Sequence, residues 1–260
     1  MSINYAIEFT LRELSGYSMF TDPLELFGTI LILVILAITI LIVVKLFNNY
    51  KETNDKATLS WALASLFLLF AIIFLIIEKL SYSTLGQPDF GRLVAMIASS
   101  CVAASLVSFS NFAFYITYPK YKDIFVIIVA ILGISYMAVL IYANIMGPPL
   151  VDVVEFELIY DISINFLIYP LLIPILTIGP VIFFYFAQKS REENRPNATR
   201  AIWLGIGLIC FGTGYIVEVA PFFPPFLSIP LRGLFLATAI IMYICFTMPE
   251  WFKKSIGWTK

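Results

Sequence analysis

Six charged or amide side chains stand at the ends of long apolar runs, and they are the residues of this chain best placed to do chemistry. Apolar walls with a few convergent polar groups are the usual form of a ligand site. We therefore predict ligand binding where these groups gather, with ordinary solvated or paired interfacial charges as the alternative. The six residues are Glu78, Arg92, Asp161, Asn165, Glu218 and Arg232.

Two of these residues are also predicted to form an ion pair. Glu218 ends one apolar run and Arg232 opens the next, so both fall near the boundary of the hydrocarbon region. An unpaired charge is costly there, and pairing offsets part of the cost of removing each group from water. We expect Glu218 and Arg232 to close the outer end between the last two spans.

The residues that most catalytic and metal centres require are missing from the sequence. The chain has no histidine, which excludes most zinc chemistry and every histidine general base. Its three cysteines lie inside apolar runs and are interpreted as small core residues. The last apolar run contains no lysine, so retinal cannot be bound there through a Schiff base. We expect no catalytic residue, no metal site and no cofactor, and the protein is not predicted to be an enzyme.

Composition places the chain in a membrane. Hydrophobic residues make up 61% of it and charged residues 13%, against about 45–50% and about 25% in soluble domains. The excess occurs in runs long enough to span a bilayer. We predict an all-α, polytopic membrane protein with a seven-transmembrane helix bundle over residues 23–254. The predicted spans are 26–44, 57–77, 93–118, 124–146, 162–188, 201–220 and 231–248.

The two ends of the chain are assigned separately. Residues 1–22 are predicted to form an amphipathic interfacial segment, because apolar residues recur there at helical spacing with charges between them. Residues 255–260 are predicted to be a short cytoplasmic tail. Residues 48–60 are interpreted as a polar loop between the first two spans.

Basic residues predict the orientation of the bundle. Residues 189–200 carry the densest basic cluster and are interpreted as a loop on the cytoplasmic side, because basic loops stay inside. With the N-terminus outside and the C-terminus inside, 12 of the 16 basic residues are cytoplasmic. The four that remain outside are Arg12, Lys79, Arg92 and Arg232.

Two spans have unusual compositions, and each leaves two interpretations open. The third span is the most polar, and it carries either a packing stripe of small residues or a polar conduit; the stripe is Ser100, Ala104, Ser108 and Asn111. The fifth span contains three prolines that interrupt its hydrogen bonding, so it carries either a moving hinge or static kinks; they are Pro170, Pro174 and Pro180.

The last two spans resemble the seven-transmembrane N-terminal sensor region of prokaryotic membrane histidine kinases. The likeness lies in Arg200 at the inner start, Gly205 and Gly212, the proline-rich outer turn and Pro249 at the inner exit. Span number, orientation and length extend it over about residues 23–254. It implies a sensor in the plasma membrane of a prokaryotic cell. Because only nine residues follow Trp251, the kinase part is expected to be absent, and any signal would pass to a separate partner.

Three functions remain open from the sequence. The first is a receptor-like sensor that binds a small or lipidic ligand near the outer face and signals through a cytoplasmic or membrane partner. The second is a transporter or channel for a small solute, and the third is a structural subunit of a membrane complex. The lipid bilayer is a partner in every case, and a net charge of −1 indicates no nucleic acid.

The predicted orientation is tested by labelling introduced cysteines in intact cells. Cysteine at Asn54 or Asn197 should be shielded from an impermeant thiol reagent, because both positions are predicted to be cytoplasmic. Cysteine at Asp152 should be labelled. Modification of the Asn197→Cys variant in sealed cells would show the orientation to be reversed.

Overall fold

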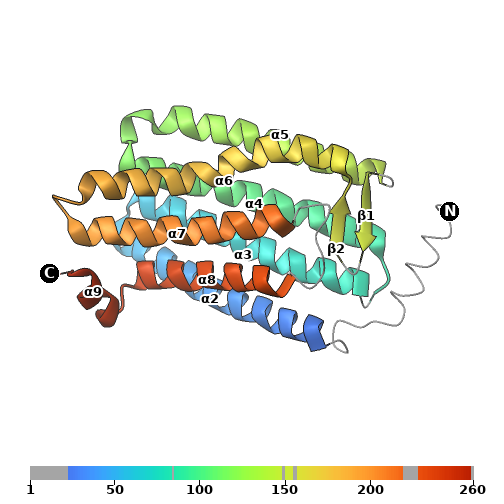
Figure 1. Cartoon of the computed structure of the whole chain (residues 1–260), viewed down its shortest axis with the longest axis horizontal. Coiled ribbons are helices and arrows are strands. Elements are labelled where there is room, and N and C mark those ends of the chain that lie inside the picture. Colours follow the sequence, from blue (N-terminus) through green and yellow to red (C-terminus); the bar gives the residue numbers. More distant parts are fainter. Residues whose placement is uncertain (1–22, 84, 148–149, 155–156, 219–227, 259–260) are drawn as a thin grey trace.

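The structure is a computed structural model that describes residues 23–83, 85–147, 150–154, 157–218 and 228–258. Within these ranges, the side chains of residues 23–25, 83, 152–154, 157–159, 218 and 228 are not described. The predicted interfacial segment, residues 1–22, lies outside the described residues. The seven-helix prediction is confirmed, because seven helices of the described chain are long and apolar enough to cross a membrane (Figure 1). They are α2 (Pro23–Thr53), α3 (Lys56–Ser83), α4 (Pro88–Thr117), α5 (Lys122–Met146), α6 (Ile162–Ser190), α7 (Arg195–Glu218) and α8 (Ser228–Thr247).

The helices pack in sequence order and form a closed ring. Each of α3 to α8 contacts the helix before it, and α2 contacts both α3 and α8, which completes the ring. α4 also contacts α6 across one side of the ring. The described connections between these helices therefore lie at the two ends of the bundle. The end that holds the α3–α4 connection is the predicted outer end, and the end that holds the α6–α7 connection is the predicted inner end.

Helices extend further into the predicted inner loops than the sequence indicated. α2 continues to Thr53 and α3 begins at Lys56, so most of the predicted loop 48–60 is helical. The predicted loop 189–200 is likewise helical at both ends, and only residues 191–194 lie between α6 and α7. The change from apolar to polar residues marks where a helix leaves the hydrocarbon region, and a helix can continue beyond that point into water.

A short β-hairpin joins α5 to α6 at the predicted outer end (Figure 1). Strand β1 (Val151–Val154) pairs antiparallel with β2 (Glu157–Tyr160), with Val151 opposite Tyr160. Both of these residues are buried. The hairpin was not predicted, and it places Tyr160 inside the bundle.

The predicted inner end carries two short helices. The 3₁₀ helix η1 (Pro119–Tyr121) links α4 to α5. Helix α9 (Glu250–Ile256) follows α8 and buries Phe252 and Ile256. α9 therefore extends two residues into the predicted tail, residues 255–260.

Hydroxyl and amide groups of α4 tie it to α3. Ser105 Oγ donates to the Ala64 carbonyl at 2.8 Å, and Asn111 Nδ2 donates to Ser60 Oγ at 2.7 Å. Ser100, predicted to share a stripe with Asn111, is instead exposed and donates to the carbonyl of Met96 on its own helix. These contacts favour the packing interpretation of the third span at its inner half.

The prolines of α6 lie within one continuous helix. Pro170, Pro174 and Pro180 are all interior to Ile162–Ser190. Thr177 Oγ1 donates to the carbonyls of Ile173 and Pro174, at 2.8 and 3.2 Å. These are ordinary bonds to carbonyls of the preceding turn, and neither carbonyl is one that a proline four residues later leaves without its backbone donor.

The Asn111–Ser60 contact should be measurable as a coupling energy. We expect Asn111→Ala and Ser60→Ala to be coupled by about 0.6 kcal/mol, the mean for side-chain hydrogen bonds between membrane helices. Reversible unfolding of the two single variants and the double variant in detergent micelles measures it. Ser100→Ala is the control and should leave stability unchanged, because Ser100 does not reach α3. Strictly additive effects of the two alanines would contradict the contact.

Candidate functional site

A cavity of about 260 Å³ lies between α2, α3, α4, α7 and α8. Its walls are mainly aliphatic and aromatic, and its lining extends on α3 from Trp61 to Lys79. The fold leaves this space because α4 and α6 pack together on the other side of the ring, where the core around Leu140, Ile168 and Leu172 is fully buried. We call this space the outer cavity.

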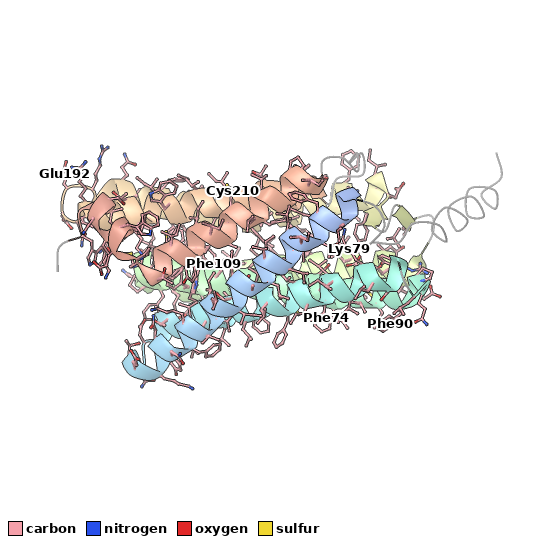
Figure 2. The ribbon with its side chains drawn as sticks, turned by 90° about the horizontal axis from the view of Figure 1, so that it is seen from below. Phe74, Lys79, Phe90, Phe109, Glu192 and Cys210 are labelled. Atoms are coloured by element: carbon pink, nitrogen blue, oxygen red, sulfur yellow. The ribbon has the colours of Figure 1, made fainter. Side chains whose placement is uncertain are left out.

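Helix α2 covers the outer cavity. Figure 2 shows α2 crossing the bundle obliquely, next to the labelled Lys79 of α3. Ile35 of α2 is buried in one apolar cluster with Ile72 of α3 and Ala239 of α8. Both helices therefore hold α2 in place, and part of its inner surface forms the roof of the cavity.

Charged residues line the outer part of the cavity. Glu78 and Arg232, both predicted as ligand-binding residues, line it and are only 7% and 3% exposed. Lys79 lines it as well. The guanidinium of Arg232 lies against Gly28 of α2, where a Cβ atom would overlap it. A glycine at this position lets the arginine pass between α8 and α2.

Tyrosines supply hydroxyl groups beside these charges. Tyr160 and Tyr215 line the cavity. The Tyr215 hydroxyl lies 2.8 Å from that of Tyr136, which is fully buried on α5. Asn144 Nδ2 donates to the Tyr160 hydroxyl at 3.1 Å. Tyr136, Tyr215 and Asn144 were missed by the sequence analysis, because spacing within one helix does not show which residues of other helices face it.

Three of the predicted site residues have structural partners at the same end of the bundle. Arg92 pairs with Asp89 in the first turn of α4. Asp161 caps α6 by accepting a hydrogen bond from the Ser163 backbone at 2.9 Å, and bonds from Ser163 lower the pKa of its carboxyl. Asn165 is buried and donates to the carbonyl of Tyr160 at 2.9 Å, so it supports the residue that lines the cavity.

The remaining predicted residue, Glu218, ends α7, and its side chain lies outside the described residues. The predicted Glu218–Arg232 pair therefore stays a prediction. The structure brings Glu78 and Arg232 to one cavity, and it places Arg92, Asp161 and Asn165 around the same end without making them part of the lining.

An aromatic cluster closes the deep end of the outer cavity. The Trp61 ring packs against Phe109, Phe112 and Phe246, with centroid separations of 4.8, 4.6 and 4.4 Å. Trp61, Phe109 and Met242 belong to the lining. Figure 2 places Phe109 near the middle of the bundle's length. The cavity therefore combines a charged outer end with an apolar, aromatic inner end.

A metal site within the described part of the chain would require at least three ligating side chains close together. In that part of the chain, no three histidine, cysteine or acidic residues gather closely enough to hold a metal ion. Cys101, Cys210 and Cys245 are free thiols, and Cys245 is buried. The arrangement at the outer cavity suits binding through charge and apolar contact.

Comparisons with protein families, with curated proteins and with solved structures find no match to this chain. Function must therefore be argued from the cavity itself.

The position of Arg232 is tested by adding one methyl group to α2. Gly28→Ala should destabilise the protein by about 1–2 kcal/mol, because the new Cβ overlaps a buried guanidinium and overpacking costs this much in a closed site. Thermal unfolding in detergent measures the change. Gly233→Ala is the matched control, since a Cβ there meets nothing within 4 Å, and it should be neutral or slightly stabilising.

The same substitution in a protein that lacks the Arg232 side chain separates this clash from any other effect at Gly28. In an Arg232→Ala protein, Gly28→Ala should no longer cost stability. An unchanged cost in that background would show that Arg232 is not what occupies the space beside Gly28.

Proposed function

We propose that this protein is a seven-helix, receptor-like sensor of the plasma membrane of a prokaryotic cell. Its ligand is amphipathic, with a small anionic head and a single apolar chain, and it binds in the outer cavity. The observation that supports this most directly is the cavity's own polarity, with charged groups at one end and an aromatic end wall at the other.

Charge favours an anionic head. The lining contains two cationic side chains, Lys79 and Arg232, and one carboxylate, Glu78. In the described part of the lining, cationic side chains therefore outnumber carboxylates. An arginine offers paired N–H donors that match the geometry of a carboxylate or phosphate.

Shape favours a single chain. From Glu78 to Trp61, α3 advances about 26 Å at about 1.5 Å per residue, so the cavity is elongated. Its volume of about 260 Å³ is just below the range of about 300–1,000 Å³ that is usual for drug-sized ligands. A long, narrow space of this size suits one acyl chain better than a compact ring system or a two-chain lipid.

Helix α2 provides the route for a signal. It covers the cavity, contacts α3 and α8, and continues to Thr53 at the predicted inner end. A ligand beneath α2 that binds one position of this helix more tightly than another shifts the helix toward that position. A separate partner at the predicted inner face would then read the shift, as the resemblance to kinase sensor regions suggests.

Transport of the same ligand is the second candidate. A further cavity at the predicted inner end also has Trp61 in its lining, so the two cavities share this residue as a wall. A carrier needs a space open to each side of the membrane and a barrier that separates them.

Terminally brominated dodecanoic acid tests ligand binding, because bromine quenches nearby tryptophan fluorescence. In a protein with Trp203→Phe, Trp251→Phe and Trp258→Phe, only Trp61 remains to report. We expect saturable quenching by the 12-bromo acid, displacement by unlabelled dodecanoic acid, and much weaker quenching by the 2-bromo acid. Arg232→Gln should weaken binding about tenfold or more, as expected for losing a charged hydrogen bond.

Arg195→Gln is the matched control, because Arg195 is exposed at the start of α7 and should not affect binding. Equal quenching by the two bromo acids would contradict a chain that reaches Trp61. A sealed-vesicle assay then separates the two candidates: a sensor binds dodecanoic acid without accelerating its transfer across the bilayer, and a carrier accelerates it.

A further inference from the structure

A second cavity, of about 350 Å³, opens among α2, α3, α4, α6, α7 and α8 at the predicted inner end. We call it the inner cavity. A larger share of its lining is polar than in the outer cavity, and its polar side chains include Asn49, Thr58 and Asn197. Its position does not depend on whether the outer cavity binds an acyl chain, so the inference below is independent of the proposed function.

Arg200 brings a positive charge into this cavity. It lies within α7, is only partly exposed and has its guanidinium 5.4 Å from the centre of the Phe246 ring. Its Nε atom is buried and makes no hydrogen bond, and among the described residues no carboxylate forms an ion pair with Arg200. A cation–π contact offsets only part of the cost of removing a cation from water.

Trp61 brings a second unsatisfied donor. Its side chain is 5% exposed, and its indole Nε1 has no hydrogen-bond partner in the described structure. Buried indole N–H groups usually find a partner. Trp61 of α3 and Arg200 of α7 therefore line one cavity, and each has a buried nitrogen without a hydrogen-bond partner.

Asp55 also lines the inner cavity, but its carboxylate already has donors. It caps α3, accepting from the Thr58 backbone at 2.9 Å, the Thr58 hydroxyl at 2.8 Å and the Ala57 backbone at 3.3 Å. Burial raises the pKa of Asp55, yet these hydrogen bonds outweigh it and keep the pKa below its usual value. Asp55 is thus an ionised cap of α3, and Arg200 is left without a counterion.

We infer that the inner cavity is an anion-binding site, in which Arg200 and the Trp61 indole donate to a carboxylate or phosphate group. A guanidinium and a neutral N–H converging on one space satisfy several oxygens of such a group at once. The anion supplies the acceptors that both donors lack. Free phosphate and the headgroup of an anionic lipid share this chemistry, and the experiment below distinguishes them.

Iodide tests the site directly, because it is an anion that quenches tryptophan. In the protein that retains only Trp61, iodide quenching should be saturable and should fall when inorganic phosphate is added at constant ionic strength. Caesium, a cationic quencher, should have little effect, and neutral acrylamide reports access alone. Arg200→Gln should weaken iodide binding about tenfold, since it removes a charged donor, and should leave acrylamide quenching unchanged.

Two further variants guard against a merely structural effect. Arg200→Lys keeps the charge and should retain most of the iodide quenching. Arg195→Gln removes an exposed arginine from the same helix and should change nothing. Phosphate competition is measured in the Trp61-only protein with Arg200 intact, so the inference can be tested even if Arg200→Gln fails to fold.

Phosphate competition and nanodiscs of two lipid compositions distinguish a free anion from a lipid headgroup. Competition by phosphate assigns the site to a free anion. If phosphate has no effect but phosphatidylglycerol nanodiscs block iodide where phosphatidylcholine nanodiscs do not, the occupant is a lipid headgroup. The inference is wrong if neither competes, or if caesium quenches Trp61 as strongly as iodide does.

Discussion

A polar group inside a bilayer can find hydrogen-bond partners only within the protein, and this constraint shapes the whole structure. It makes every span a helix, since a helix satisfies its own backbone. Hydroxyl groups also donate hydrogen bonds to carbonyls of their own helices, as Thr39 does to Ile35 and Ser110 does to Leu106. Hydroxyls and amides that reach another helix, such as Thr238 on the Gly207 carbonyl, become the specific links of the bundle.

Because of the same constraint, buried polar atoms that make no hydrogen bond need an explanation. Five buried side-chain atoms of the described residues lack a hydrogen-bond partner, and two of them, Trp61 Nε1 and Arg200 Nε, belong to residues that line the inner cavity. The outer cavity differs in kind. Its charges lie at one end, and the rest of its lining is mainly apolar with a few hydroxyl groups. One space is therefore suited to an extended apolar chain and the other to a compact anion.

The spans could be predicted well from the sequence, whereas the segments that adjoin them could not. Length and apolar composition depend on the bilayer alone, so the number and approximate bounds of the helices could be predicted. Helix ends in water depend on caps and short turns, which is why α2, α3 and α7 extend beyond the predicted spans. The hairpin before α6 depends on pairing between two short segments, and the polar composition around Asp152 did not indicate it.

The candidate sites show the same division. Glu78 and Arg232 could be assigned to one end of the bundle from helix length, and the structure brings both to one cavity. Trp61 and Tyr215 carried no signal, because an aromatic residue in an apolar run is ordinarily core. Arg200 was interpreted as a loop residue that marks the cytoplasmic side. Only the arrangement of α7 against α8 shows that its side chain lies over Phe246 inside the bundle.

Trp61 belongs to the linings of both cavities, and this has a thermodynamic consequence. A single indole ring that is the end wall of one space and a donor in the other cannot adjust to one occupant independently of the second. If an occupant of either cavity changes the affinity of the other by some factor, linkage requires the reverse change by the same factor. The two cavities would then be coupled through Trp61, in addition to any shift of α2.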